Sequence, residues 1–171
     1  MNRPPDKDPK RQWQGKKSRN YGKRFEERLD AAFEYYQRKG LADIEKTPEP
    51  MRPIKSLGDG RFVAVYVKKA QADYKGTVKG GRTYVFEAKY TEKGRLEQNR
   101  VTEEQTRYLD RHQELGARCF ILAGFSSGDV YRVPWDVWKN MKEAFGRKYV
   151  TERDLNPYRV YLGWNSLLQL I

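Results

Sequence analysis

The sequence predicts a single domain of mixed α/β class. Three observations support this: a helical apolar stripe near the N-terminus, several segments whose side chains alternate as in strands, and two later helical segments among those strands. A chain of 171 residues has room for one domain with a substantial core. We therefore expect helix, several strands, helix, two strands and a final helix, in that order.

The N-terminal region divides into a basic tail and a helix. Residues 1–19 are rich in Pro, Lys and Arg and offer almost nothing to bury, so we expect a disordered tail and a folded domain over residues 20–171. A helix is expected from about Tyr21 to Lys39, ending at Gly40. Its apolar positions fall on one stripe: Phe25, Leu29, Ala32, Phe33 and Tyr36.

Strands are expected after this helix. Residues 41–46 form a short strand, and residues 61–69 alternate as a second. Because the stretch between them is too proline-rich for a central strand, we interpret residues 48–72 as an excursion from the core. In the strand that contains Glu87, residues Val85, Glu87 and Lys89 share one face, while Tyr84, Phe86 and Ala88 share the other.

The second half continues the pattern. A helix over residues 102–115 begins with Thr102 and Gln105 in the spacing of a capping box. Residues 117–125 and 129–134 are short apolar strands, and residues 134–146 begin a helix with proline in its first turn. Residues 156–171 alternate too weakly for an assignment.

Composition indicates a polyanionic partner. The chain carries 35 Lys and Arg against 23 Asp and Glu, a net charge of +12, and 13% aromatic residues. Nucleic acid is the usual partner of such a chain, although a basic protein that is merely soluble is the alternative. Cys119 has no second cysteine to pair with, and no segment suits a membrane span or a secretory signal, so we expect a cytoplasmic protein.

Asp73, Glu87 and Lys89 suit metal-assisted hydrolysis of a phosphodiester. Mg²⁺ prefers oxygen ligands and keeps several waters, so Asp73, Glu87 and the carbonyl of Ala88 suffice as protein ligands. The Lys89 ammonium can orient a water and stabilise developing negative charge. We expect both carboxylates to be ionised at neutral pH, because metal and lysine favour the charged form.

A Glu-x-Lys triplet is weak by itself. Charged residues make up about a quarter of average sequences, so the triplet arises by chance roughly once in such a chain. The structural alternative is an ion pair on an exposed strand face. The apolar strand around the triplet, the upstream Asp73 and the basic composition favour a nuclease site.

Several motifs together resemble one family. Asp73 followed by Glu87-x-Lys89 resembles the core signature of the PD-(D/E)XK nuclease superfamily. The stretches NYGKRFEERLDAAFEYY, IEKTPEP, DYKG, FEAKYT, EEQ and GARCFIL occur in the order and approximate spacing of RecU-type Holliday junction resolvases. This resemblance covers roughly residues 20–125. It implies a restriction-endonuclease-like core, a mixed sheet flanked by helices, with a protruding stalk at about residues 48–72.

The resemblance also implies roles for residues of the site. Asp73 and Glu87 would bind Mg²⁺, for which Mn²⁺ would substitute, and Lys89 would be the catalytic lysine. Glu26 would add a further carboxylate ligand. Gln105 would lie near the active site, beside its capping role.

The same resemblance implies a homodimer that cuts two opposed strands of a four-way DNA junction. The stalk would enter the centre of the junction. We expect DNA contacts from basic residues at the stalk, in the following strand and in the tail: Lys46, Arg61, Lys68, Lys69, Lys75, Lys16, Lys17 and Arg19.

The chain departs from the family pattern at three points. Ala72 stands where the superfamily has proline, Thr102 stands where the family commonly has histidine, and the stalk is several residues shorter than usual. Such departures are expected of a divergent member, for example a phage-encoded one. Another endonuclease of the superfamily, or a non-catalytic DNA-binding protein, stays open as an alternative.

Overall fold

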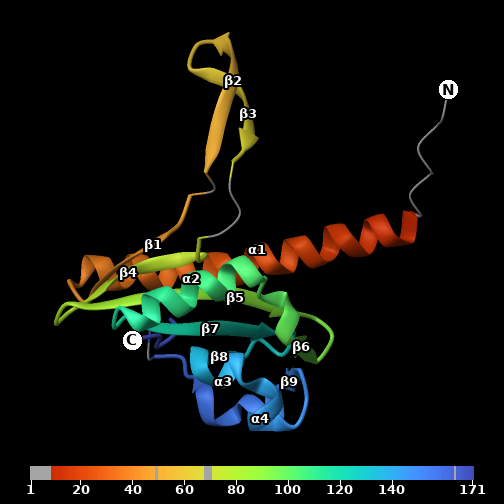
Figure 1. Cartoon of the computed structure of the whole chain (residues 1–171), viewed down its shortest axis with the longest axis vertical. Coiled ribbons are helices and arrows are strands. Elements are labelled where there is room, and N and C mark those ends of the chain that lie inside the picture. Colours follow the sequence, from red (N-terminus) through yellow and green to blue (C-terminus); the bar gives the residue numbers. More distant parts are fainter. Residues whose placement is uncertain (1–8, 49, 68–70, 164) are drawn as a thin grey trace.

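The structure, a computed structural model, describes residues 9–48, 50–67, 71–163 and 165–171, with only the backbone for residues 9–19. Its centre is a six-stranded sheet (Figure 1). The strand order is β1 (Ala42–Lys46), β4 (Tyr74–Val78), β5 (Arg82–Thr91), β7 (Arg118–Phe125), β8 (Val130–Pro134) and β10 (Arg159–Val160). Strands β5 and β7 are parallel and the other pairs antiparallel, which confirms the predicted mixed α/β class.

Helices cover both faces of this sheet. Helix α1 (Pro9–Arg38) packs its predicted apolar stripe against one face, where Tyr84 and Phe86 of β5 are buried. Helix α2 (Glu103–Glu114) covers the other face, with α3 (Trp135–Lys139) and α4 (Met141–Phe145) beside it. Val85 belongs to this second core, so the alternation predicted for β5 is confirmed.

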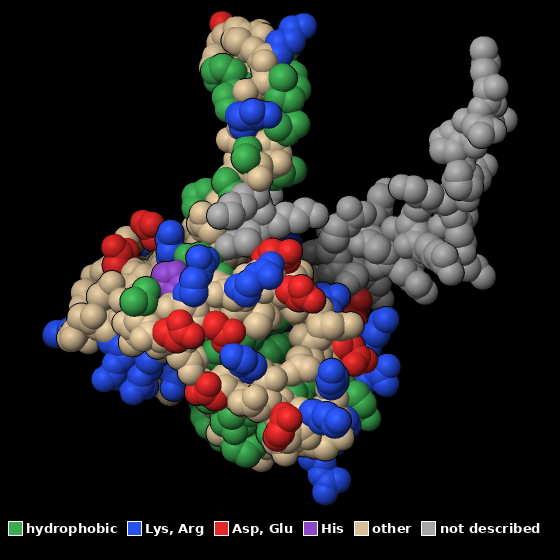
Figure 2. Space-filling view, in the orientation of Figure 1, with side chains coloured by type: hydrophobic (Ala, Val, Ile, Leu, Met, Phe, Trp, Pro, Cys, Tyr) green, Lys and Arg blue, Asp and Glu red, His purple; other side chains and the backbone are tan. Residues whose placement is uncertain are grey.

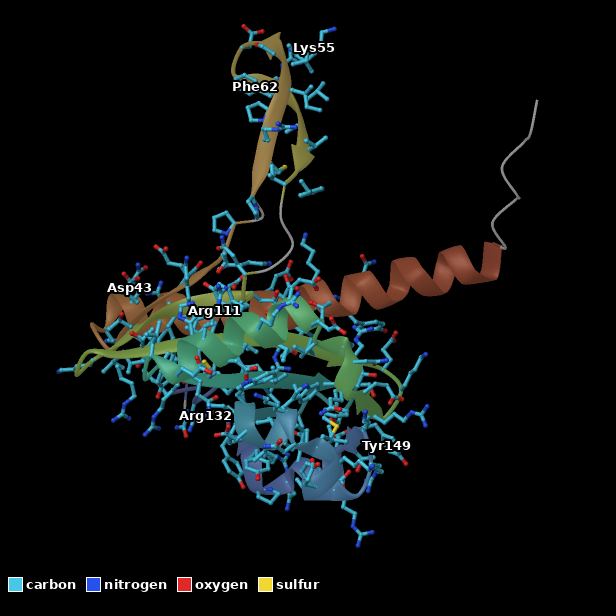
Figure 3. All side chains as sticks on the ribbon, in the orientation of Figure 1. Asp43, Lys55, Phe62, Arg111, Arg132 and Tyr149 are labelled. Atoms are coloured by element: carbon cyan, nitrogen blue, oxygen red, sulfur yellow. The ribbon has the colours of Figure 1, made fainter. Side chains whose placement is uncertain are left out.

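The excursion predicted around residues 48–72 contains a hairpin of β2 (Met51–Gly58) and β3 (Arg61–Tyr66), which we call the stalk. It projects from the body beside the sheet, with Lys55 and Phe62 near its tip (Figures 1 and 3). All residues of both strands are exposed, and many are hydrophobic (Figure 2). Pro53 lies at a register shift of β2, a position where an isolated hairpin tolerates proline.

Two helix predictions need correction. Helix α1 begins at Pro9 and not near Tyr21, so residues 9–19 of the expected disordered tail are helical, while residues 1–8 lie outside the described residues. Proline is favourable in a first turn, and the Lys, Arg and Gln residues that follow are good helix formers. The single helix expected over residues 134–146 is two short helices, α3 and α4, which meet at Asn140.

The remaining elements are short and were not predicted. Strand β6 (Arg95–Glu97) pairs with β9 (Tyr149–Thr151), and the 3₁₀ turn η1 (Gln98–Arg100) follows β6. After β9 come α5 (Glu152–Leu155), the turn η2 (Asn156–Tyr158) and the edge strand β10. In the described part of the chain, no helix is long and apolar enough to cross a membrane.

Gly76 brings β1 close to β4. A Cβ atom at this position would lie 2.0 Å from the carbonyl oxygen of Asp43, a distance that backbone atoms cannot accept. Glycine therefore lets β1 pair across β4, where Gly76 is opposite Ile44. That pairing also brings Lys46, at the end of β1, opposite Tyr74 and next to Asp73.

Candidate active site

Strand pairing brings Asp73, Glu87 and Lys89 together, as the sequence predicts. Tyr74 of β4 is opposite Phe86 of β5, so Asp73 reaches the level of Glu87. The Asp73 carboxylate accepts a hydrogen bond from the backbone N–H of Ala88 at 3.0 Å. Lys89 Nζ lies 2.6 Å from Glu87 Oε2 and 3.4 Å from Asp73 Oδ2, which links the three charged groups.

Glu87 is the buried member of this cluster. Its side chain is 0% exposed, whereas that of Asp73 is 34% exposed. Burial is the largest cause that raises the pKa of Glu87, to about 8; Lys89 opposes the rise and the nearby Asp73 charge adds to it. Our expectation of an ionised Glu87 at neutral pH is therefore wrong for the metal-free chain, because desolvation outweighs the lysine.

Gln105 has both of the roles considered for it. Its side-chain carbonyl accepts from Thr102 N at 3.1 Å, and its own backbone N–H donates to Thr102 Oγ1, which completes the capping box of α2. Its Nε2 donates to Glu87 Oε2 at 2.6 Å. The start of α2 is thereby tied to the buried carboxyl group on β5.

The structure does not bring Glu26 to the other two carboxylates. Glu26 lies on α1, and its Oε2 accepts a hydrogen bond from Lys46 Nζ of β1. No group of three or more His, Cys, Asp or Glu side chains suited to a metal ion is found within the described ranges. The expected convergence of three carboxylates is thus incomplete, because the Lys46 ammonium attracts the Glu26 carboxylate toward the root of the stalk.

An open cleft of about 410 Å³ lies over this cluster. Glu26 and Asp73 both line it, on the same side of the sheet edge as Ala88 and Lys89. Its lining also includes residues that the sequence analysis did not single out: Gly22, Lys23, Phe25, Tyr90 and Arg100. Arg100 could not be selected from the sequence, because it is one of many arginines and its motif carries no chemical signature. A separate pocket of about 320 Å³ lies at the opposite end of β5, lined by Tyr84 and Arg118.

The donor set fits a divalent cation. Glu87 Oε1 is buried and has no hydrogen-bond partner among the residues that the structure describes, so it is an uncompensated oxygen beside a second carboxylate. Two carboxylates this close repel each other, and a hard cation that prefers oxygen ligands would relieve that repulsion. Asp73 and Glu87 are the residues that would hold it.

The predicted DNA contacts fall at different places. Lys46 and Lys75 are exposed on β1 and β4, and Arg61 is exposed on the stalk, where it pairs with Asp59 at 3.6 Å. Lys68 and Lys69 lie outside the described residues. Lys16, Lys17 and Arg19 lie in α1, where only the backbone is described. The contacts themselves stay predictions.

Comparison with known proteins decides the family. The family described as recombination protein U, RecU, matches residues 20–169, which is most of the chain. The chain belongs to the RecU family. This confirms the resemblance found in the motifs between residues 20 and 125 and extends it almost to the C-terminus.

Relatives and one solved structure show similar coverage. The Holliday junction resolvase RecU of Geobacillus sp. (strain WCH70) is 31% identical over 158 residues, which are 84% of this chain and 77% of that relative. The one of Streptococcus sanguinis (strain SK36) is 32% identical over 123 residues, 67% of this chain and 60% of the relative. The solved structure of Hjc, a Holliday junction resolvase of Archaeoglobus fulgidus, aligns with a TM-score of 0.49 at 13% identity over 83% of this chain and 92% of that one.

Proposed function

We propose that this chain is a Mg²⁺-dependent endonuclease that resolves Holliday junctions by paired cuts in two opposed strands. The observation that carries the proposal is the buried Glu87 beside Asp73, with Lys89 between their oxygens, in a chain of the RecU family. A protein that only binds DNA gains nothing from this arrangement, because adjacent carboxylates repel phosphate.

The residues of the cluster have separate tasks. Asp73 and Glu87, with the carbonyl of Ala88, hold the cation, and Glu26 lines the same cleft as a further carboxylate. When bound, Mg²⁺ lowers the pKa of a water and neutralises charge on the phosphate. Lys89 orients the attacking water and stabilises negative charge that develops on the phosphate oxygens. Gln105 keeps Glu87 in place through the hydrogen bond from its Nε2.

The stalk and the basic residues supply selectivity for branched DNA. The stalk is exposed along its whole length and stands apart from the sheet, so it can enter the open centre of a four-way junction (Figure 1). Lys46 and Lys75 lie on the strands beside its root, where they can neutralise phosphates of the arms. Two copies of the chain, related by a two-fold axis, match the two opposed strands that are cut.

The test is strand cleavage of a synthetic four-way junction compared with linear duplex of the same sequence, with Mg²⁺ or with EDTA. The variant is Asp73→Asn, and the matched control is Asp43→Asn, an exposed aspartate on β1 (Figure 3). We expect symmetric nicks on the junction with Mg²⁺ for the wild type and the control, and none with EDTA or Asp73→Asn.

Two other outcomes would change the assignment. Cleavage of linear duplex at one sequence would identify a restriction-type or repair endonuclease of the superfamily. Tight junction binding without Mg²⁺-dependent cleavage would leave a DNA-binding protein. The mass of the protein in solution, with and without a junction, tests the proposed homodimer.

A further inference from the structure

Arg100 lines the cleft above the Asp73–Glu87–Lys89 cluster, across the sheet edge from α1. It is exposed at the end of η1. Within the described part of the chain, no hydrogen bond or ion pair engages its guanidinium group. Lys89, in contrast, is occupied by both carboxylates. Arg100 therefore presents an uncommitted cation to whatever enters this cleft.

The backbone that carries Arg100 is fixed on both sides. Before it, Gln98 Nε2 donates to the carbonyl oxygens of Trp138 at 3.0 Å and Lys139 at 2.8 Å, which fastens η1 to the end of α3. After it, Val101 is buried, with 7% of its surface exposed. The chain then enters the capping box of α2.

The same segment continues to Glu87. Gln105, five residues after Arg100, is held by the capping box and donates to the Glu87 carboxyl at 2.6 Å. The position of the Arg100 backbone relative to Glu87 is thus set by an unbroken series of contacts. A guanidinium on such a support can serve a defined geometric role, which a side chain on a loose loop cannot.

A phosphate diester is the ligand that this site fits. The cleft is lined by Asp73 and Glu26, so an anion that enters it needs cationic groups to offset their repulsion. Arginine offers paired N–H donors that match two oxygens of one phosphate, which an ammonium does not. Lys23 of α1 lines the opposite side of the cleft, but its ammonium lies 3.7 Å from Glu27.

We propose that Arg100 binds a phosphate of the DNA strand to be cleaved and so positions that strand over Asp73 and Glu87. This inference rests on the proposed nuclease function for its effect on cleavage, while the phosphate contact itself is independent of catalysis. Arg100 is a substrate-binding residue in this account; the hydrolytic step belongs to the carboxylates and Lys89.

The experiment compares Arg100→Gln and Arg100→Lys with the wild type. The control is Arg82→Ala, which removes an exposed arginine at the other end of β5, roughly 20 Å from Lys89 by strand geometry. Binding of a four-way junction is measured in EDTA at several salt concentrations, and cleavage is measured with Mg²⁺. Thermal unfolding of each variant establishes that it is folded.

For Arg100→Gln we expect junction affinity in EDTA to fall about tenfold, since one charged hydrogen-bond contact is lost. The slope of log affinity against log salt should decrease by about 0.9. Arg100→Lys should retain the salt slope but cleave more slowly than the wild type, because an ammonium cannot hold the phosphate in the same orientation. Arg82→Ala should behave as the wild type in both assays.

The outcomes separate the two proposals. If the wild type cleaves the junction and Arg100→Gln matches Arg82→Ala in affinity, salt slope and cleavage, the phosphate-binding role of Arg100 is wrong. If the wild type binds the junction with the Arg100-dependent salt slope but does not cleave it, the role of Arg100 stands and the proposed nuclease function fails. If Arg100→Gln lowers cleavage with an unchanged salt slope, Arg100 does not contact phosphate and the inference is again overturned.

Discussion

The buried Glu87 makes the stability of the metal-free chain depend on pH. Burial raises the pKa of its carboxyl from 4.5 to about 8, so the folded chain keeps this proton over a range in which the unfolded chain has released it. The stabilising contribution is fully present below pH 4.5 and is lost as the pH rises through 8. The substitution Glu87→Gln removes this titration, because glutamine is neutral throughout.

The size of the effect follows from the shift. Each pH unit between the two pKa values changes the free energy of unfolding by at most about 1.4 kcal/mol, so the interval from pH 5 to pH 8 contributes at most about 4 kcal/mol. For a chain of this length, that corresponds to a decrease in melting temperature of roughly 10 °C. Asp110 and Asp154 have lowered pKa values and titrate below this interval.

The assay is thermal unfolding in EDTA at several pH values from 5 to 8. The comparison is between the wild type, Glu87→Gln and the control Glu45→Gln, an exposed glutamate on β1. The melting temperature of the wild type and the control should fall with pH more steeply than that of Glu87→Gln. His112, whose pKa burial lowers, titrates in this interval but is common to all three proteins. Parallel curves for the wild type and Glu87→Gln would refute the reasoning.

Three further substitutions test other contacts. Lys89→Met should lower Mg²⁺-dependent cleavage at least about 100-fold while junction affinity in EDTA stays within about threefold of the wild type, because Lys89 acts on the developing charge; a parallel loss of binding would contradict this role. Gly76→Ala should destabilise the fold by about 3 kcal/mol in urea unfolding, since its Cβ would meet the backbone of Asp43; Gly22→Ala, in open space on α1, is the control and should not destabilise. Thr102→Val removes the acceptor for Gln105 N and should cost about 1 kcal/mol of stability, and an unchanged urea midpoint would show that the capping box is not stabilising.

Local patterns in the sequence were sufficient for most of the core. The apolar stripe of α1, the alternation along β5 and the capping box of α2 were all predictable, because each depends on residues within one or two turns or on the two-residue period of a strand. The short elements β6, β9 and β10 were not, since strands of two or three residues carry too few alternating positions to register as a pattern.

The charged cluster was predictable as a set of residues, but not in its energetics. Spacing and motif order pointed to Asp73, Glu87 and Lys89, and strand pairing brings them together. The raised pKa of Glu87 depends on how completely α2 and the sheet exclude water from its carboxyl, which no local pattern reports. Likewise, the pairing of Glu26 with Lys46 depends on where α1 crosses β1.

By itself, then, the sequence determined the class of the fold, the family and the residues that can carry the chemistry, since these follow from local periodicity and from motifs in fixed order. The tertiary structure alone decided which carboxyl is buried, which carboxylate is drawn toward the stalk and that Arg100 reaches the cleft. The physical reason is that burial and charge pairing arise from groups that are distant along the chain and meet only when the sheet and its helices pack.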